Sequence, residues 1–323
     1  MSKGDPSLEK VFEGTEFAQR VSLQPKNPTM DKKICIVVCP TGSLFSRKQN
    51  PTQPYSPEEI AQEVIESFKE GACMVHLHCR DERGFTRSTP ETIKKTLDLI
   101  FAECPDIISA PTIHSGLEPE KGFYALETVK PFVDSLLEYG ERYIETAVFT
   151  PISFAMGPYV CKVTKEVARS TVGYLENKGI KPEFMGHNFE AIQNVYEWLI
   201  KPGIIEKPYF ITMAPGMHHA AETYPDPVGL LYMINMKQVF PDDTVVGASI
   251  GGHNWLSLAT LALLLGVDTV RVGKEDTMWL YPHKDEILRR NADAVKKIAT
   301  IAKELGRDIA TPEEARRILG IKR

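Results

Sequence analysis

The feature that most constrains the fold is a regular alternation of short apolar segments with longer amphipathic ones. Short apolar runs rich in β-branched residues are typical of buried strands, whereas apolar residues three and four positions apart are typical of helices. An alternation that runs through eight strands predicts an α/β protein with a (β/α)8 fold, the TIM barrel. The predicted strands are residues 34–38, 74–78, 107–110, 142–146, 183–185, 209–213, 244–248 and 269–272.

Helix signals support this alternation. Ser56 precedes the clearest helical pattern, residues 57–69, and Glu59 stands three positions later, which is a capping-box arrangement. A short helix after Thr311, ending at Leu319, lies outside the eightfold count. We therefore expect an N-terminal extension over residues 1–32, and one TIM-barrel catalytic domain over residues 33–323 that ends with the extra helix. The other predicted helices are residues 90–102, 159–178, 190–200, 227–239, 256–265 and 285–305.

Composition excludes several classes of protein. The formal net charge is -5 and the basic residues are scattered, so the sequence indicates binding neither to nucleic acid nor to a membrane surface. No apolar window is long enough to span a bilayer, and the first thirty residues lack the apolar core of a signal peptide. We expect a cytoplasmic protein that acts on a small molecule. The six cysteines form no disulfide framework and are expected to be reduced thiols.

Two histidines stand at the end of the second predicted strand. Residues two positions apart on a strand project from the same face, so His76 and His78 can bind one divalent metal ion. Zn²⁺ is commonly held by two histidines and a carboxylate, with a position left open for substrate. Glu275, which follows the last predicted strand, can supply the carboxylate. An alternative remains in which both histidines are hydrogen-bonded core residues.

The residues that follow the predicted strands would share one rim of the barrel, where TIM barrels carry their active sites. Five of the eight strands bring a histidine to this rim, which random placement would rarely do. The rim residues are Thr41, Gly42, His76, His78, Thr112, His114, Ser115, Glu145, His187, Asn188, His218, His219 and the ranges 249–253 and 271–276.

Residues 271–276 place a permanent cation, a glycine and two carboxylates within one short segment. Arg271 can hold a carboxylate through two parallel hydrogen bonds. An aspartate such as Asp276, beside a metal-bound carbonyl group, can remove a proton from the adjacent carbon. In isolation the segment could also be a solvated loop of ion pairs. Its combination with the distant histidine pair favours a functional site.

Several motifs together resemble the β-keto acid cleavage enzyme family, the family of the 3-keto-5-aminohexanoate cleavage enzyme. The specific ones are His76-Leu77-His78 and the Arg-Val-Gly-x-Glu-Asp pattern of residues 271–276. Further matching segments are residues 40–42, 55–60, 71–81, 182–183, 214–217 and 310–315, in the family's order from about residue 33 to the C-terminus. The resemblance implies a barrel enzyme that depends on Zn²⁺ or another divalent transition metal and uses acetyl-CoA as co-substrate.

The resemblance also implies roles for individual residues. The metal would be held by His76, His78 and Glu275. Asp276 would be the base that forms the enolate of a β-keto acid, with Arg271 beside it. The enolate would attack the thioester of acetyl-CoA, CoA would pass to the former keto carbon, and acetoacetate would leave together with a new acyl-CoA. The family likeness further suggests a homo-oligomer, expected to be a tetramer.

The substrate pocket departs from that of the family member acting on an amino-substituted keto acid. That member carries glutamates where this chain has Leu44 and Met185, so two acceptors for an ammonium group are missing. We therefore expect a less polar side chain or a different head group. The remaining family contacts correspond to Thr112 and Ser115, which can bind the substrate carboxylate, and to Glu145 or Thr146.

Two other functions are compatible with a barrel of this kind. An amidohydrolase-type metal hydrolase also uses a His-x-His pair, and His187, His218 and Asp276 could be its remaining ligands. Against it, the pair here lies on the second predicted strand instead of the first. A catalytically silent barrel could bind metal or an acyl-CoA as a sensor, although rim sites on this fold are nearly always catalytic.

Overall fold

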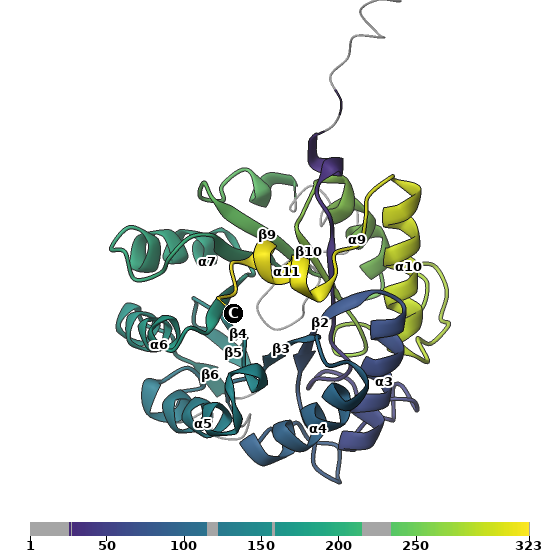
Figure 1. The fold of residues 1–323 in the computed structure, drawn as a ribbon, viewed down its shortest axis with the longest axis horizontal. Helices are drawn as coiled ribbons and strands as arrows, with labels where there is room; N and C mark the ends of the chain where they lie inside the picture. Colours follow the sequence, from purple (N-terminus) through teal and green to yellow (C-terminus); the bar gives the residue numbers. More distant parts are fainter. Residues whose placement is uncertain (1–25, 27, 115–121, 157–158, 215–233, 323) are drawn as a thin grey trace, which may run out of the picture.

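The computed structural model describes residues 26, 28–114, 122–156, 159–214 and 234–322. Eight parallel strands form one sheet in the order β3-β2-β1-β10-β9-β8-β7-β4. The backbone N–H of Glu145 donates to the carbonyl of Ser109 at 3.1 Å, which links the two edges of the sheet between β3 and β4. The result is a nearly closed barrel surrounded by helices (Figure 1), and the prediction of a TIM barrel is confirmed.

The barrel strands are β1 (Cys35–Val38), β2 (Ala72–Leu77), β3 (Ile108–Pro111), β4 (Thr146–Phe149), β7 (Lys181–Gly186), β8 (Tyr209–Met213), β9 (Thr244–Ser249) and β10 (Thr269–Val272). A small antiparallel hairpin, β5 (Phe154–Met156) and β6 (Tyr159–Cys161), follows β4.

The helices are α3 (Pro57–Lys69), α4 (Pro90–Glu103), α5 (Leu126–Tyr139), α6 (Lys165–Asn177), α7 (Phe189–Asn194), α9 (Trp255–Leu264), α10 (Asn291–Glu304) and α11 (Pro312–Leu319). A π-helical segment, η4 (Val195–Ile200), continues α7, and short 3-10 turns cover η1 (Pro28–Asp31) and η3 (Glu141–Tyr143). Ser56 caps α3 with the capping box predicted from the sequence, and Thr311 caps α11 in the same way. None of the helices in the described ranges is long and apolar enough to cross a membrane.

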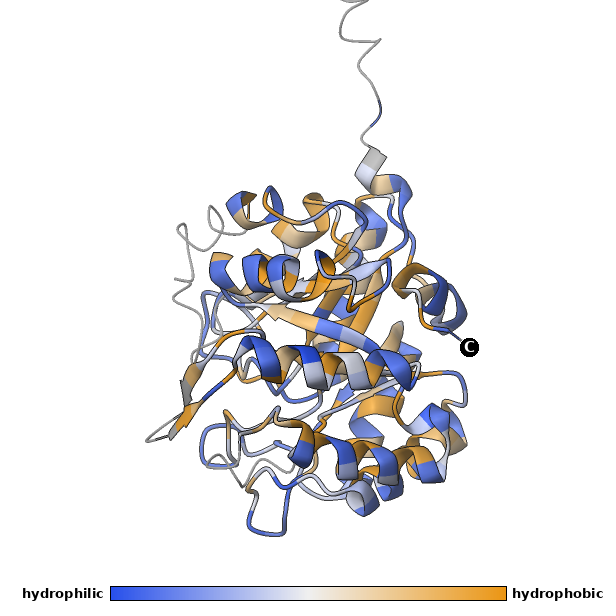
Figure 2. Ribbon diagram, turned by 90° about the vertical axis from the view of Figure 1, so that its left-hand side faces the viewer, coloured by the Kyte–Doolittle hydropathy of each residue, from blue (hydrophilic) through white to orange (hydrophobic). Residues whose placement is uncertain are grey.

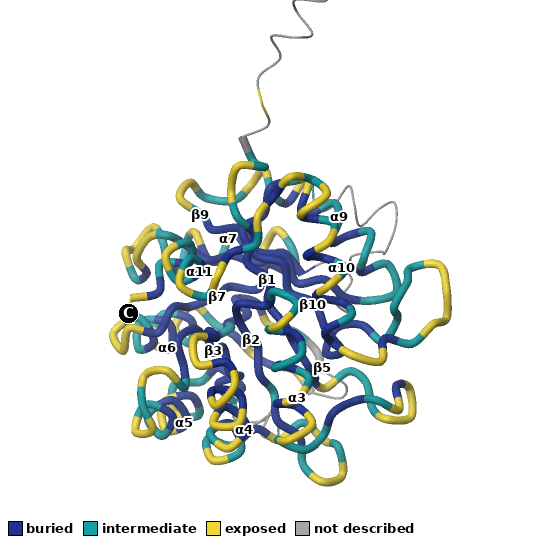
Figure 3. Tube along the Cα trace, turned by 45° about the vertical axis from the view of Figure 1, so that its right-hand side comes forward, coloured by how far each residue is buried: buried dark blue, intermediate teal, exposed yellow. Residues whose placement is uncertain are grey.

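Helix α11 closes one end of the barrel. Its Leu319 and Ala315 pack in one cluster with inward-facing strand residues such as Val37, Phe210 and Val245. In Figure 1 this helix lies across the ring of strands. The strands carry the apolar residues in the middle of the molecule, and the helices turn polar faces outward (Figure 2). Burial follows the same division, because the strands are buried and the outer loops are exposed (Figure 3).

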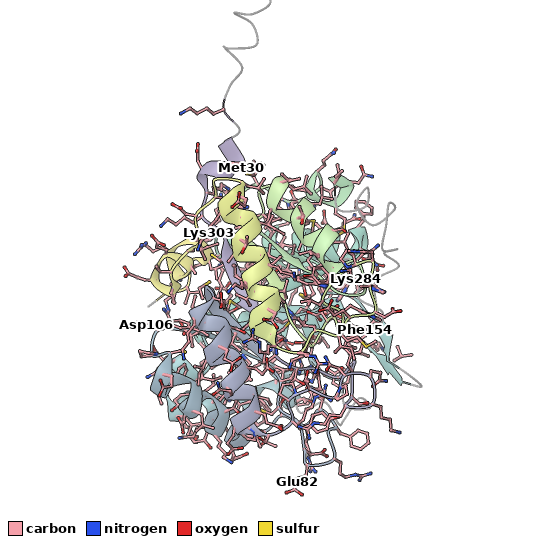
Figure 4. The ribbon with its side chains drawn as sticks, turned by 90° about the vertical axis from the view of Figure 1, so that its right-hand side faces the viewer. Met30, Glu82, Asp106, Phe154, Lys284 and Lys303 are labelled. Atoms are coloured by element: carbon pink, nitrogen blue, oxygen red, sulfur yellow. The ribbon has the colours of Figure 1, made fainter. Side chains whose placement is uncertain are left out.

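The two ends of the barrel can be followed in Figure 4. Asp106, which precedes β3, lies on one side, whereas Phe154 and Lys284, which follow β4 and β10, lie on the other. Because all eight strands are parallel, their C-terminal ends meet on the side of Phe154 and Lys284. The side chains that follow the strands are therefore brought together there.

The strand predictions are confirmed with one important shift. The fourth strand was expected at residues 142–146, but the structure has η3 at Glu141–Tyr143 and the strand at Thr146–Phe149. Ile144, Ala147 and Phe149 are all buried, so the apolar signal continues past the predicted end. Residue 145 thus precedes the strand and residue 146 begins it, so neither follows it.

Two helix predictions also change, and one helix was not predicted. The helix expected at 159–178 begins only at Lys165, because residues 159–161 form β6. The helix expected at 285–305 begins at Asn291. Helix α5 was not predicted, and its internal Pro131 is a residue type that usually ends a helix. Most of the helix expected at 227–239 lies outside the described residues.

All six cysteines are free and buried, as expected for reduced thiols in a folded core. The two-part division into an extension over residues 1–32 and a single domain over residues 33–323 stays a prediction, because most of the extension lies outside the described residues.

Candidate metal centre and substrate cavity

The histidine pair ends β2 on the inner side of the barrel. His76 lies within the strand and is buried, and His78 follows it two residues later. Their Nε2 atoms are 3.1 Å apart, and the two rings meet edge to face. At this separation one ring nitrogen can donate to the other, or both can direct their lone pairs at one shared cation.

Glu275 completes a three-residue cluster from the loop after β10. Its Oε1 lies 3.3 Å from Nε2 of His78, and its Oε2 lies 3.8 Å from Nε2 of His76. One ligand atom from each residue lies within 4.8 Å of the others. Tetrahedral Zn²⁺ with ligands at about 2.0–2.1 Å needs neighbouring donor atoms roughly 3.4 Å apart. The three measured separations between the donor atoms, 3.1, 3.3 and 3.8 Å, lie on both sides of that value.

The protonation states suit metal binding. Burial and the nearby Arg271 hold the pKa of His76 well below its usual value, so its imidazole is neutral. Burial alone would raise the pKa of Glu275, but Arg271 and the two histidines outweigh it and lower that pKa below its usual value. Neutral imidazole and ionised carboxylate are the forms that ligate metals. Among the described residues, the buried Oε2 of Glu275 has no hydrogen-bond partner, which a bound cation would satisfy.

Arg271 holds the two carboxylates of the loop after β10. Its Nε and Nη2 each lie 3.1 Å from one oxygen of Asp276, and its Nη2 lies 2.8 Å from Oε1 of Glu275. The guanidinium group is buried, so these charge-assisted hydrogen bonds act in a low-dielectric setting.

Asp276 has two further neighbours. The thiol of Cys39 lies 3.2 Å from its Oδ2, and the hydroxyl of Ser249 lies 3.4 Å from the same oxygen. Burial, together with the charge of Glu275, raises the pKa of Asp276 to about 6, although Arg271 opposes the rise. Asp276 is thus a carboxylate of increased basicity held on several sides. Ser249 was expected on the rim from the sequence, whereas Cys39 was not, because its only signal is that it directly follows β1.

The backbone of this loop approaches β1 closely. Gly273 has a φ of +151°, and a side chain there would lie 2.1 Å from the carbonyl oxygen of Cys39. Lys274 turns away from the barrel and is fully buried, where its ammonium donates to Glu63 of α3 and to the carbonyl of Thr52. Successive side chains of this loop therefore point in different directions: Lys274 points away from the barrel, and Glu275 points toward the histidines.

A cavity of about 250 Å³ lies at the C-terminal ends of the strands. Three of the six substrate-binding residues expected from the sequence, Leu44, Thr112 and Met185, line it. Ser115 lies outside the described residues. The complete lining in the described part of the chain is Ser43, Leu44, His76, His78, Thr112, His114, Phe123, Tyr124, Val148, Thr150, Phe154, Met185, His187, Arg271 and Glu275.

The remaining two expected substrate contacts are not at this cavity. Glu145 precedes β4, and its carboxylate accepts hydrogen bonds from Arg316 of α11 at 2.7 and 2.9 Å, at the opposite end of the barrel. Thr146 is the buried first residue of β4. The expectation for both residues is corrected because the strand begins four residues later than predicted. Val148 and Thr150 occupy the cavity in their place.

The ligand set of an amidohydrolase is not assembled in the part of the chain described. Asp276 has both oxygens engaged by Arg271, and the cluster within metal-binding distance contains Glu275 instead. His187 lines the cavity without joining that cluster, and His218 lies outside the described residues.

Comparisons with known proteins show which family the chain belongs to. The model of the family described as beta-keto acid cleavage enzyme matches residues 33–321. A 3-keto-5-aminohexanoate cleavage enzyme from Fusobacterium nucleatum is 30% identical over 91% of this chain and 100% of its own length. A 3,5-dioxohexanoate:acetyl-CoA acetone transferase from Paraburkholderia graminis is 26% identical over 90% of this chain and 96% of its own.

Among solved structures, a ternary complex of ObcA with a C4-CoA adduct and oxalate is similar in fold. Its TM-score is 0.64 at 18% sequence identity, over 84% of this chain and 68% of that chain. At this identity the likeness concerns the barrel architecture alone. It agrees with the strand order described above.

Proposed function

The chain belongs to the β-keto acid cleavage enzyme family and is an acyltransferase, and on that basis we propose that it exchanges acyl groups between a β-keto acid and acetyl-CoA. In this reaction the enolate carbon of the keto acid bonds to the acetyl carbonyl carbon, the bond to the former keto carbon breaks, and CoA passes to that carbon. The products are acetoacetate and a new acyl-CoA, so atoms balance without an added oxidant or reductant.

The observation that carries the proposal is the position of Asp276 relative to the three-residue cluster. Arg271 bonds to both Asp276 and Glu275, so the proposed base and the proposed ligands belong to one rigid unit. His76, His78, Glu275 and Arg271 all line the same cavity. A keto acid there would meet the cation directly, whereas Asp276 is not among the lining residues and its fully buried carboxylate is bonded to Arg271, which does line the cavity. Removal of a proton next to a carbonyl group requires such a base close to the cation.

We infer that His76, His78 and Glu275 hold Zn²⁺ or a similar divalent transition metal. Two imidazoles and one carboxylate, with room for a further ligand, match the donor set of catalytic zinc sites. When bound, such an ion would polarise the keto oxygen and stabilise negative charge as it develops there.

Asp276 is proposed as the base. It would accept the proton from the carbon between the keto and carboxylate groups. Its pKa of about 6 makes it a stronger base than an ordinary aspartate while it stays mostly ionised near neutral pH. Arg271, Cys39 and Ser249 would keep its carboxylate in one orientation. Thr112, with Ser115, is proposed to donate hydrogen bonds to the carboxylate of the substrate.

The direct test mixes the purified protein with acetyl-CoA and a panel of β-keto acids and follows acetoacetate. Acetoacetate that forms only when both reagents are present would support the proposal. Product that forms with water and without CoA would instead support a hydrolase, and binding of both ligands without turnover would support a sensor. Metal analysis of the same sample tests the proposed Zn²⁺ independently.

We also propose a homo-oligomer, expected to be a tetramer, on the strength of the family resemblance. Light scattering on the full chain would test it, and a monomer at micromolar concentration would contradict it.

The single catalytic domain over residues 33–323 is supported by the family match over residues 33–321. The cytoplasmic location stays a prediction.

A further inference from the structure

The lining of the cavity divides into two arcs of the barrel. Strands β2, β1 and β10 are neighbours, and they carry His76, His78, Glu275 and Arg271. We call this the charged arc. Strands β7 and β4 are also neighbours, and β3 stands at the other edge of the sheet, next to β4 in the closed barrel.

The lining contributed by β3, β4 and β7, which we call the neutral arc, has a different character. It consists of Thr112, His114, Val148, Thr150, Met185 and His187, together with Phe123, Tyr124 and Phe154 from the segments that follow β3 and β4. In the described residues, no aspartate, glutamate, lysine or arginine belongs to it. Met185 and Val148 pack together with Ala214, so part of this wall is an apolar surface.

Two of the titratable rings in this lining, His114 and Tyr124, are held neutral by burial. Burial lowers the pKa of His114 to about 3, with His78 contributing, and burial raises the pKa of Tyr124 to about 12. His114 also lies against Phe123 at 4.7 Å between ring centroids, which adds to an aromatic wall. Leu44 brings one more apolar side chain to the cavity from the loop after β1.

The two ends of a β-keto acid require different surroundings in the cavity. Its keto group must lie at the charged arc, where the proposed ligands are and where Arg271 holds the proposed base, and its carboxylate would reach Thr112, which follows β3 beside β2. Its remaining substituent must then extend toward the neutral arc. An ammonium or carboxylate on that substituent would lose its water without gaining a partner of opposite charge, which strongly disfavours binding.

We propose that the preferred substrate is a β-keto acid whose substituent is uncharged and mainly apolar, a short alkyl chain or an aromatic ring, seated against Val148, Met185 and Leu44. This inference rests on the proposed function. A cavity of about 250 Å³ favours a small group, since pockets for drug-sized ligands measure about 300–1,000 Å³.

The test compares three acids of the same chain length at saturating acetyl-CoA: 3-oxohexanoate, 3-oxoadipate and 5-amino-3-oxohexanoate. We expect kcat/KM for the neutral acid to exceed both charged ones by at least 100-fold. Within a neutral series, each added CH₂ should raise kcat/KM by about fourfold until the cavity is filled. Equal or better turnover of either charged acid would overturn the inference while leaving the proposed function intact.

A binding measurement with unreactive analogues further distinguishes failure of this inference from failure of the proposed function. The unreactive 3-hydroxy analogues of the neutral and dicarboxylic acids are titrated by calorimetry in the absence of acetyl-CoA. Tighter binding of the neutral analogue would support the inference even if turnover required another acyl donor. If neither analogue binds and no acid yields acetoacetate, both the inference and the proposed function are wrong.

A variant that adds a negative charge to the neutral arc tests the inference most directly. Met185→Glu places a carboxylate on the neutral arc and should shift the ratio of kcat/KM toward the ammonium acid by at least 100-fold. Met185→Gln, of the same shape without the charge, is the matched control and should not produce that shift. Leu44→Glu, at a partly exposed loop position, serves as a second charged variant if Met185→Glu fails to fold. A shift of equal size in Met185→Gln would overturn the electrostatic explanation.

Discussion

At the N-terminal end of the barrel, Arg316 donates to both oxygens of Glu145, and α11 seals the barrel with Leu319 and other apolar residues. At the C-terminal end, Arg271 likewise holds Asp276 through two hydrogen bonds, yet the neighbouring Glu275 keeps one oxygen without a hydrogen-bond partner in the part described. Both ends thus pair an arginine with a buried carboxylate, although Arg271 is buried and Arg316 is partly exposed.

The two ends of the barrel differ in whether a buried polar atom in the described residues remains without a hydrogen-bond partner. Both oxygens of Glu145 accept hydrogen bonds from Arg316, and this ion pair joins α11 to the barrel. The cluster at the other end has two imidazole nitrogens and a carboxylate oxygen that face one another. Buried polar groups left incomplete in a folded protein mark a place where a ligand belongs. A buried arginine-carboxylate pair therefore indicates function only when its surroundings are unsatisfied.

Removal of a proposed ligand should give the largest effect. In Glu275→Ala, we expect bound metal to disappear and turnover to fall by about 1,000-fold or more, because a catalytic metal supplies several kcal/mol of charge stabilisation. Metal content and acetoacetate formation are measured on the same sample, and His76→Ala should behave alike. Full metal occupancy in Glu275→Ala would remove this residue from the ligand set.

Asp276→Asn should separate the base from the metal. Bound metal should be retained, whereas turnover should fall by roughly 100- to 10,000-fold, the usual contribution of a positioned base. Exchange of the C2 protons of the keto acid with solvent, followed by NMR, reports the same step without acetyl-CoA. A normal exchange rate in this variant would show that another group removes the proton.

Leu319→Ala should weaken the sealed end without touching the cavity. Leu319 is fully buried in α11, so its truncation should lower the free energy of unfolding by about 2–5 kcal/mol. Urea denaturation measures the change, and metal content serves as the control because it should not alter. If the stability stayed unchanged, α11 would not be part of the cooperative core.

Glu145→Gln should give the smallest effect and tests the corrected assignment. The substitution leaves Arg316 without its charged partner, and since Arg316 is partly exposed to solvent, we expect a loss of about 1–3 kcal/mol in the free energy of unfolding. The KM for the keto acid should be unaffected. A raised KM with unchanged stability would instead support the original expectation that Glu145 contacts substrate.

Much of the fold and the site could be predicted because each signal is local. Alternation of strands and helices, the caps at Ser56 and Thr311, and the pairing of His76 with His78 depend only on neighbouring residues. The start of β4 could not be located in this way, because the strand-like residues Tyr143 and Ile144 adjoin the strand although Glu141–Tyr143 forms a 3-10 turn without a buried residue. That single shift moved Glu145 and Thr146 away from the cavity and brought in Val148 and Thr150.

By itself, the sequence determined the barrel class, the family and the residue types able to bind a metal, since periodicity and motif spacing are properties of the chain. Only the tertiary structure decided which side chains meet. Cys39 reaches Asp276 across 237 positions of sequence, and the neutral arc exists because β3, β4 and β7 become neighbours when the sheet closes. The physical reason is that contacts between distant segments depend on the register and curvature of the closed sheet, which no local pattern records.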